Sequence, residues 1–528
     1  MLVYARNGMV ATSQPLAAQA GLEVLRRGGN AVDAAVATAA ALTVLEPTSN
    51  GIGSDAFALV WSGGRLYGLN ASGPAPALAS AEQLEREGRW EVPLYGWPAV
   101  TVPGAPAAWA ALQARFGRLP LERLLEPAVE YAERGYPLPP VVGAAWSSAA
   151  ERYRRLAGER PDLFGPWLET FAPEGEAPRI GGLWRSLGHA RTLRLIAESG
   201  AEAFYRGELA ERVDAFARRT GGWLRAADLA AYRPEWVEPL SVRYRGLDVW
   251  ELPPNGQGLV ALMALQVLEG LEGAGGGPGA EAEAERLHLA IEAVKLAFEE
   301  GFREIADPRA MRLEPSDLLD PERARQRRRR IGPRALEPEP GPRPNGGTVY
   351  LCTADGEGNM VSYIQSNFAG FGSGLVVPET GIALQNRGAC FNLQPGHPNR
   401  LEAGKRPYHT IIPGFLSREG VPLGPFGVMG GLMQPQGHVQ LLSGLVDLGL
   451  NPQAALDAPR WRWVDGRRVE FEPGTPPHLV EALARRGHEV SWAVGSASFG
   501  RGQVILRLEE GVLVGASEPR ADGQVAAW

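Results

Sequence analysis

Cysteine and histidine are scarce in this chain of 528 residues. The two cysteines, Cys352 and Cys390, are too few for a disulfide framework and lack the spacing of metal ligands. The seven histidines are scattered, and neither an HExxH nor a CxxC motif occurs. We therefore predict no structural metal.

Long hydrophobic runs are also missing. The most apolar stretch, residues 31–45, is interrupted by Asp33, Thr38 and Thr43, and it is shorter than the roughly 20 residues that a membrane span needs. Residues 1–7 lack the basic region and apolar core of a signal peptide. We expect a soluble, cytoplasmic protein without a membrane partner.

The chain has no excess of positive charge. Its net charge is −7 and its pI is about 5.7, which argues against nucleic acid as a partner. The basic run at residues 327–330 has acidic neighbours, so we interpret it as a solvated helix end or part of a linker. A hydrophobic content of 45% and a mean hydropathy of −0.16 are typical of a soluble globular protein.

Helical and strand patterns follow one another along the first two thirds of the chain. Residues 15–27 have helical spacing, and Asn30 is placed to cap a second, largely apolar helix at 31–45. A buried strand is predicted at 56–61, and a Gly-Gly turn leads to another at 65–69. Further helices are predicted at 105–116, 121–134, 208–218 and 281–301, with a glycine-rich loop at 270–280.

A segment rich in proline, arginine and glutamate precedes a clear β pattern. We interpret residues 322–347 as a mobile processing linker, because helical periodicity fails after Ile331. A strand at 348–354 follows, and a turn joins it to a second strand at 360–366. Helical patterning returns only at 439–448.

The junction Gly347–Thr348 has the composition of a self-cleavage site. A threonine at a new N-terminus carries a hydroxyl nucleophile and an α-amine that can act as its base. Gly346 and Gly347 permit the twisted backbone that attack by Thr348 on the preceding carbonyl requires. Cleavage would give a large chain, residues 1–347, and a small chain, residues 348–528. The local pattern fits the start of an uncleaved hairpin equally well.

Two other groups are placed to serve this chemistry. In an antiparallel hairpin Ser366 lies beside Thr348 and can hold its hydroxyl, although a plain cross-strand pair is the alternative. Gly430 and Gly431 lie between a β-like run and a helix, where consecutive amides can form an oxyanion hole. A tight strand–helix turn is the alternative for these glycines.

Several longer motifs are spread along nearly the whole chain: Gly29-Asn30-Ala31-Val32-Asp33-Ala34-Ala35, Pro253-Pro254-Asn255-Gly256-Gln257-Gly258, Gly381-Ile382-Ala383-Leu384-Gln385-Asn386, Lys405-Arg406-Pro407 and Ala458-Pro459-Arg460. Together with the junction residues, they resemble the motifs of γ-glutamyltransferases (glutathione hydrolases), which are N-terminal-nucleophile hydrolases. The resemblance implies an α+β fold, a four-layer αββα sandwich built from two chains made by self-cleavage.

The resemblance also implies roles for the junction residues. Thr348 would be the nucleophile and, through its freed amine, the base, with Ser366 as its hydrogen-bond partner and Gly430 and Gly431 as the oxyanion hole. The enzyme would form an acyl-enzyme from γ-glutamyl amides such as glutathione and pass the acyl group to water or an amine, without a cofactor. Its partners would be a small-molecule amide and its own cleaved chains, and a homodimer of processed heterodimers stays open.

The expected substrate pocket departs from the γ-glutamyl pattern. Asn70 stands where the family has an arginine for the α-carboxylate, Cys390 where it has an aspartate for the α-amine, and His409-Thr410 where it has paired serines. A zwitterionic glutamyl group would lose charge-assisted bonds at these positions. Cys390 is interpreted as a small buried thiol rather than a second nucleophile.

Other residues favour a different acyl group. Arg387 and His409 suggest a pocket for an anionic acyl group without an α-amine, and Asn367 completes the predicted substrate-binding set. The pattern also resembles glutaryl-cephalosporin acylases and oxamate amidohydrolase. An acylase of glutaryl or oxamate type, or an unprocessed non-catalytic homologue, therefore stays open beside the γ-glutamyl reading, as does His409 as a general base.

Overall fold

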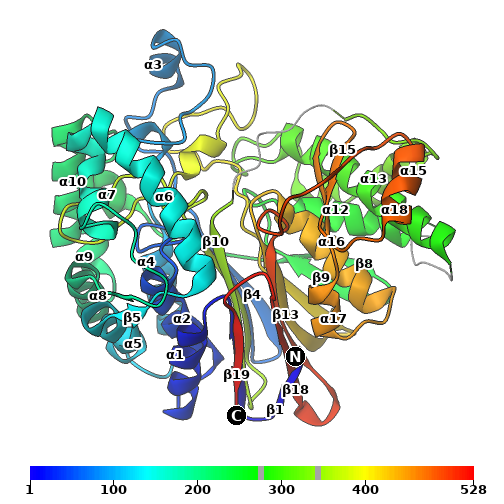
Figure 1. The fold of residues 1–528 in the computed structure, drawn as a ribbon, viewed down its shortest axis with the longest axis horizontal. Coiled ribbons are helices and arrows are strands. Elements are labelled where there is room, and N and C mark those ends of the chain that lie inside the picture. The colour runs from blue at the N-terminus through cyan, green and yellow to red at the C-terminus, as the bar shows by residue number, and fades with distance from the viewer. Residues whose placement is uncertain (272–278, 339–345) are drawn as a thin grey trace.

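Two seven-stranded antiparallel sheets form the centre of the computed structural model, which describes residues 1–271, 279–338 and 346–528 (Figure 1). The first sheet has the order β1 (Val3–Ala5), β18 (Leu513–Ser517), β17 (Arg501–Arg507), β13 (Val421–Met429), β12 (Gly414–Arg418), β9 (Leu247–Glu251) and β8 (Leu240–Tyr244). The second has the order β19 (Gln524–Ala527), β2 (Gly8–Thr12), β10 (Thr348–Asp355), β11 (Met360–Ser366), β3 (Asp55–Ser62), β4 (Arg65–Ala71) and β7 (Glu235–Val237). Each sheet contains strands from both sides of residue 347.

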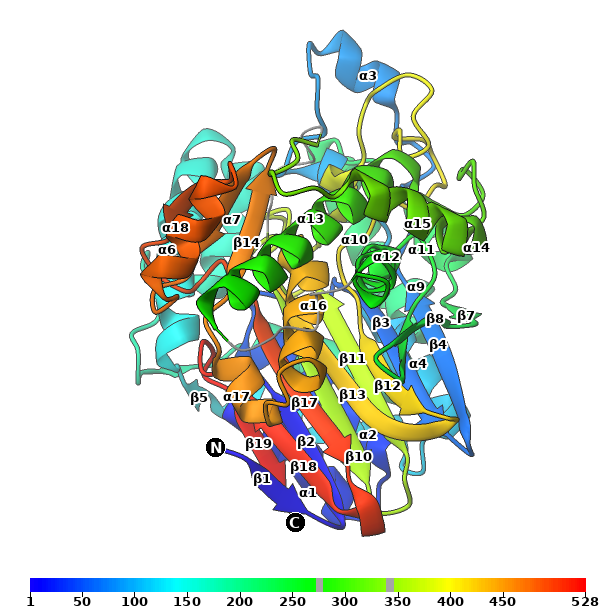
Figure 2. The ribbon, with the colours of Figure 1, turned by 90° about the vertical axis from the view of Figure 1, so that its right-hand side faces the viewer.

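Helices cover the outer face of each sheet (Figures 1 and 2). The second sheet is covered by α1 (Pro15–Arg26), α2 (Ala31–Leu45) and α4 (Ala105–Phe116), with α5 (Leu121–Arg134), α6 (Pro140–Glu159), α8 (Leu187–Ser199) and α10 (Glu208–Thr220) outside them. The first is covered by α12 (Gly258–Glu269), α16 (Met433–Val446) and α17 (Pro452–Asp457), with α13 (Ala280–Glu304) and α18 (Pro477–Arg485) beyond. This order of layers confirms the predicted αββα sandwich. Within the described residues, no helix has the length and apolar character to cross a membrane.

β10 is covered on both faces of the second sheet. All eight of its residues are buried. Tyr350, Cys352 and Ala354 face the core between the sheets, whereas Val349 and Leu351 face the helices. A strand that is covered on both faces needs apolar or hydrogen-bonded side chains at every position. The predicted hairpin at 348–366 is confirmed.

Two local predictions differ from the structure. The helix predicted at 439–448 is present, but α16 runs from Met433 to Val446, and Pro435 is tolerated in its first turn, where its missing N–H is not needed. The predicted mobile linker, 322–347, is a helix in its first part: α15 (Pro321–Arg330) is capped by Asp320, and Arg327 is buried against Glu300 with Nε 2.7 Å from Oε2. Residues 339–345 of that linker, and 272–278 of the predicted glycine-rich loop, lie outside the described residues.

Candidate active site

Three polar side chains stand in a row across β10, β11 and β3. Thr348 is the register partner of Ser366, and Ser366 is the register partner of Asp55. Opposite residues of antiparallel strands project to the same face of the sheet. All three residues are fully buried. The predicted placement of Ser366 beside Thr348 is confirmed, and Asp55 is a third member that the sequence analysis missed.

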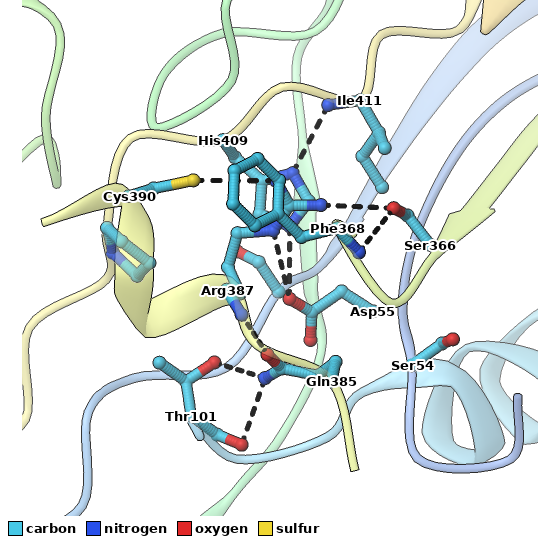
Figure 3. A network of polar contacts seen from close by, with 12 residues as sticks. Ser54, Asp55, Thr101, Ser366, Phe368, Gln385, Arg387, Cys390, His409 and Ile411 are labelled. Carbon is cyan, nitrogen blue, oxygen red and sulfur yellow. Dashed lines mark hydrogen bonds and ion pairs between the residues drawn. The ribbon is translucent and has the colours of Figure 1, made fainter. Parts of the chain in front are cut away.

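The Ser366 hydroxyl connects the predicted nucleophile with the bond to be cut. Its Oγ lies 3.0 Å from Thr348 Oγ1, and it donates to the carbonyl of Gly347 over 2.8 Å. It accepts hydrogen bonds from the N–H of Phe368 at 2.8 Å and from Arg387 Nη2 at 3.3 Å (Figure 3). One hydroxyl has one hydrogen and two lone pairs, so the bonds to Gly347, Phe368 and Arg387 already fill its capacity, and Thr348 Oγ1 is a fourth, competing contact. With Phe368 and Arg387 donating to the oxygen, the Ser366 hydrogen is directed at the Gly347 carbonyl.

The predicted oxyanion glycines lie beside the junction. Gly430 and Gly431 have φ values of 136° and 62°, a region that favours glycine. The Gly430 carbonyl accepts from the N–H of Met433 at the start of α16, over 3.1 Å. Because C=O and N–H point in opposite directions across a peptide, the Gly431 N–H points away from that helix. A Cβ built on Gly346 would lie 3.3 Å from Gly430 C, so this peptide is next to the residue preceding Gly347.

Arg387 lies between Ser366 and Asp55. It belongs to the short helix η2 (Arg387–Cys390) and is fully buried. Its Nη1 donates to Thr410 Oγ1 over 2.7 Å, and its Nε is 3.8 Å from Asp55 Oδ2. The guanidinium also stacks on the Phe368 ring, 4.8 Å from the centroid. A positive charge is thereby held 3.3 Å from Ser366 Oγ, the neighbour of the predicted nucleophile.

His409 serves the same cluster as a hydrogen-bond donor. Its Nε2 lies 3.0 Å from Asp55 Oδ2, and its Nδ1 faces the N–H of Ile411 at 3.4 Å. These contacts assign the hydrogen to Nε2, which donates to the carboxylate. Burial, with the charges of Arg387 and Arg406, lowers the pKa of His409 well below its usual value. The ring is therefore neutral and committed to Asp55, which disfavours His409 as a general base.

Asp55 carries a titratable charge near neutral pH. Burial raises the pKa of its carboxyl from 3.8 to about 7, against the opposing effect of Arg387 and of the nearby Gly73 amide. Its Oδ1 has no hydrogen-bond partner in the part of the chain that the structure describes. The sequence signal for this residue was its place between a glycine-rich loop and a buried strand. The strand prediction began one residue later, at Ala56.

Cys390 and Thr410 both contact the Arg387 guanidinium. Cys390 is half-buried rather than fully buried as predicted, and its Sγ lies 3.8 Å from Arg387 Nη1. Desolvation of the thiol still raises its pKa above the usual value. A raised pKa keeps the thiol protonated, which disfavours nucleophilic attack. The structure thus brings Arg387, Cys390, His409 and Thr410 together around Asp55 and Ser366.

Asn70 and Asn367 lie in neighbouring networks. Asn70 Nδ2 donates to Asn255 Oδ1 over 3.0 Å, and its Oδ1 accepts from the Ser72 hydroxyl over 2.7 Å. Asn70 is thus linked to the His409 segment through Asn255, whose carbonyl accepts the His409 N–H at 2.9 Å. Asn367 accepts from the Ser54 hydroxyl at 2.8 Å. Its buried Nδ2 has no partner among the described residues, so it is a donor available to a ligand.

A second cluster has the spacing of metal ligands. His288, Glu292 and His488 are buried with their ligand atoms within 4.8 Å of one another. However, His288 Nδ1 and His488 Nε2 are hydrogen-bonded at 2.9 Å, and the ammonium of Lys295 is 2.8 Å from Glu292 Oε1. A metal ion would have to displace the hydrogen shared by His288 and His488, and it would be repelled by the Lys295 ammonium. The donor set fits a polar network with its own cation better than it fits a metal.

The comparisons with known proteins agree with this geometry. The gamma-glutamyltranspeptidase family model matches residues 17–528. The chain is 57% identical to the cephalosporin acylase from Bacillus halodurans, whose crystal structure matches with a TM-score of 0.95 over 100% of this chain and 97% of that chain. It is 36% identical over 541 residues to the glutathione hydrolase-like YwrD proenzyme of Bacillus subtilis (strain 168), covering 99% of this chain and 98% of the relative. It is 35% identical over 535 residues to the oxamate amidohydrolase proenzyme of Klebsiella pneumoniae, with coverage of 99% and 98%. The chain therefore belongs to the gamma-glutamyltranspeptidase family, as its motifs predicted.

Proposed function

We propose that the protein cleaves itself after Gly347 and then hydrolyses small acyl amides with Thr348 as the nucleophile. The observation that carries this proposal is the Ser366 hydroxyl, which contacts both Thr348 Oγ1 and the Gly347 carbonyl. Nucleophile and scissile carbonyl are thus held by one group before any cleavage. The proenzyme names of the full-length relatives support the same reading.

Self-cleavage would proceed by an acyl shift. Thr348 Oγ1 attacks the Gly347 carbonyl carbon, the C–N bond breaks, and the hydroxyl hydrogen ends on the departing nitrogen. The product is an ester between Gly347 and Thr348 with a free Thr348 α-amine. Water then hydrolyses the ester and releases the large chain. Ser366 polarises the carbonyl, and the peptide of Gly430 and Gly431 is placed to stabilise the oxyanion.

The freed amine then replaces an external base. An α-amine with a pKa of about 7.7–8.0 is partly neutral near pH 7 and can take the hydroxyl hydrogen as Thr348 attacks the substrate amide. The amine leaving group receives that hydrogen, and an acyl-enzyme ester remains. Water completes the cycle by the same route in reverse. Because His409 is already bonded to Asp55, the α-amine is the better candidate for the base.

We infer that the preferred acyl group ends in a carboxylate and has no α-amine. The buried guanidinium of Arg387, 3.3 Å from Ser366 Oγ, can pair with an anionic end of the acyl chain. Cys390 supplies no charge for an ammonium group. Similarity to a cephalosporin acylase and an oxamate amidohydrolase supports this substrate class.

A γ-glutamyl amide such as glutathione is the second candidate. Asp55 is the observation in its favour, because this buried carboxylate lies beside Arg387 and offers an acceptor with no hydrogen-bond partner among the described residues. It could bind an α-ammonium from a position different from that of Cys390. The two candidates differ only in the group that faces Asp55.

Processing is tested by replacing the nucleophile. Thr348→Ala should leave a single intact chain of 56.6 kDa by mass spectrometry, whereas the wild-type protein should give two chains split after Gly347. Thr348→Ser retains a hydroxyl and should still cleave. A wild-type protein that stays intact, or an alanine variant that still splits at this bond, would refute the proposal.

The acyl group is tested with two chromogenic amides. We expect the processed enzyme to hydrolyse glutaryl-p-nitroanilide faster than γ-glutamyl-p-nitroanilide, as judged by kcat/KM. The compounds differ only in the α-amine, so the ratio reports the charge that the pocket presents to it. A preference for the γ-glutamyl compound would decide for the second candidate.

A further inference from the structure

Asp55 is the internal counter-ion of Arg387. Among the described residues, it is the carboxylate that pairs with this guanidinium, with Oδ2 3.8 Å from Nε. Both side chains are fully buried. A buried guanidinium without an opposite charge is strongly destabilised, so the pair is held together by charge even at this distance. The buried cluster around Ser366 therefore contains one positive and one negative charge when Asp55 is ionised.

The other groups that face Asp55 keep one charge state near neutral pH, so Asp55 is the group whose charge can change. Arg406 favours its ionised form, but Arg406 has a separate partner, with its Nη1 2.6 Å from Glu235 Oε2. Tyr205 and Tyr232 are buried with raised pKa values and stay neutral. The remaining neighbours are neutral as well: His409 is held below its usual pKa, and Cys390 above its own.

We propose that Asp55 determines whether this site accepts an anionic acyl group, by taking up a proton from water when a substrate carboxylate pairs with Arg387. The inference rests on the proposed function and specifies how the same site distinguishes an anionic acyl group from a neutral one. Two carboxylates that share one guanidinium repel each other, and the repulsion is relieved when one of them is protonated. A neutral acyl group causes no such repulsion, so Asp55 keeps its charge.

The hydrogen bonds around Asp55 suit this exchange. Oδ2 already accepts from His409 Nε2 and can do so whether or not the acid is protonated. No group among the described residues meets hydrogen-bond geometry at Oδ1, although the nearby Gly73 and Gly104 amides favour the ionised form, so a hydrogen on Oδ1 can be donated to the incoming carboxylate. The protonated acid then adds a hydrogen bond where the ionised form would repel.

The proposal fixes the direction of the pH dependence. Below the pKa of Asp55, about 7, the acid is already protonated and an anionic acyl group binds without proton uptake. Above it, each rise of one pH unit weakens the binding of the anionic group by up to about 10-fold, because the proton must be supplied from solution. Binding of a neutral acyl group should not change through this step.

The direct test is calorimetric proton counting on the processed wild-type enzyme. Glutarate and valerate have the same length, but only glutarate has a second carboxylate for Arg387. Titrations at pH 8.5 in buffers of different ionisation enthalpy should show that glutarate takes up close to one proton more than valerate. Equal uptake by the two ligands would overturn the proposal.

Two variants identify the group that takes up the proton. Asp55→Asn cannot be charged, so the difference in proton uptake should disappear, and the ratio of glutarate affinity to valerate affinity should become independent of pH between 7 and 9, because the Thr348 α-amine faces both ligands. Glu235→Gln removes the carboxylate beside Arg406 and should keep the wild-type difference. Retention of the difference in Asp55→Asn, or its loss in Glu235→Gln, would assign the proton elsewhere and refute the role of Asp55.

A kinetic measurement keeps the test independent of variant folding. In the wild-type enzyme, the ratio of KM for glutaryl-p-nitroanilide to KM for butyryl-p-nitroanilide should rise by up to about 10-fold per pH unit above 7. A constant ratio from pH 6 to pH 9 in an active, processed enzyme would refute the proposed role of Asp55 and leave the proposed function standing. An intact wild-type chain that hydrolyses neither amide would instead reject the proposed function.

Discussion

Gly347 shows how a single missing side chain shapes the junction. A Cβ built at this position would lie 2.4 Å from Gly370 N, in the loop after β11. That distance is far below any ordinary contact, so a side chain would push residue 347 away from the loop. Its carbonyl would then leave the Ser366 hydroxyl, which holds it at 2.8 Å. The glycine is therefore required for the alignment and not only for backbone flexibility.

We expect Gly347→Ala to slow self-cleavage by at least about 10-fold, which corresponds to about 1.4 kcal/mol of lost alignment. The rate can be followed by gel electrophoresis of freshly purified precursor. Gly332→Ala is the matched control, because a Cβ there meets no atom within 4 Å. Unchanged cleavage in Gly347→Ala would show that the carbonyl is not held in the geometry described.

At the scale of elements, the turn of the β10–β11 hairpin is joined to the start of α2. The Asp355 carboxylate accepts the N–H of Ala31 at 2.9 Å and the N–H groups of Glu357 and Asn359 at 3.0 Å each. A carboxylate at a helix N-terminus also interacts favourably with the helix dipole. One side chain thus orients both the hairpin that carries Thr348 and the helix packed on it.

We expect Asp355→Ala to lower the free energy of unfolding by on the order of 3 kcal/mol, because it leaves several N–H groups without their charged acceptor. Glu357→Ala, in the same turn, removes only an exposed ion pair with Arg118 and should leave the free energy of unfolding nearly unchanged. Both values come from denaturant unfolding of the uncleaved Thr348→Ala background. Similar losses in the two variants would contradict the role given to Asp355.

Elements with local signals could be predicted from the sequence, and the site could be predicted only in part. The Asn30 cap and the 348–366 hairpin follow from residues that are neighbours in the chain, so both were anticipated. Asp55 was missed because its place depends on β3 pairing with β11, more than 300 residues away. α15 was missed because its fold depends on Arg327 reaching Glu300, whereas its composition resembles a solvated linker.

At the scale of the whole molecule, each sheet combines strands of the two predicted chains. Hydrogen bonds also hold the segment that precedes the cleavage site at the end of the large chain. Buried side chains of α13 hold residues 331–338: Glu292 Oε2 accepts the Leu336 N–H at 2.8 Å, and Lys295 Nζ donates to the Leu336 carbonyl at 2.9 Å. The small chain contributes the Arg486 carbonyl, which accepts the Ala335 N–H at 2.8 Å. These contacts lie upstream of the bond to be cut.

We expect these contacts to survive cleavage, because none of them involves the Gly347–Thr348 bond. Hydrogen exchange should show the amides of Ala335 and Leu336 equally protected in the processed wild-type protein and in uncleaved Thr348→Ala. Glu292→Ala should speed exchange at Leu336 roughly 10- to 100-fold, as expected for loss of a buried hydrogen bond to a charged group. Glu299→Ala, on the same helix, removes only the pair with Arg330 and should leave Leu336 unchanged. Rapid exchange of both amides in the processed wild-type protein would show instead that the large chain releases its whole end once the bond is cut.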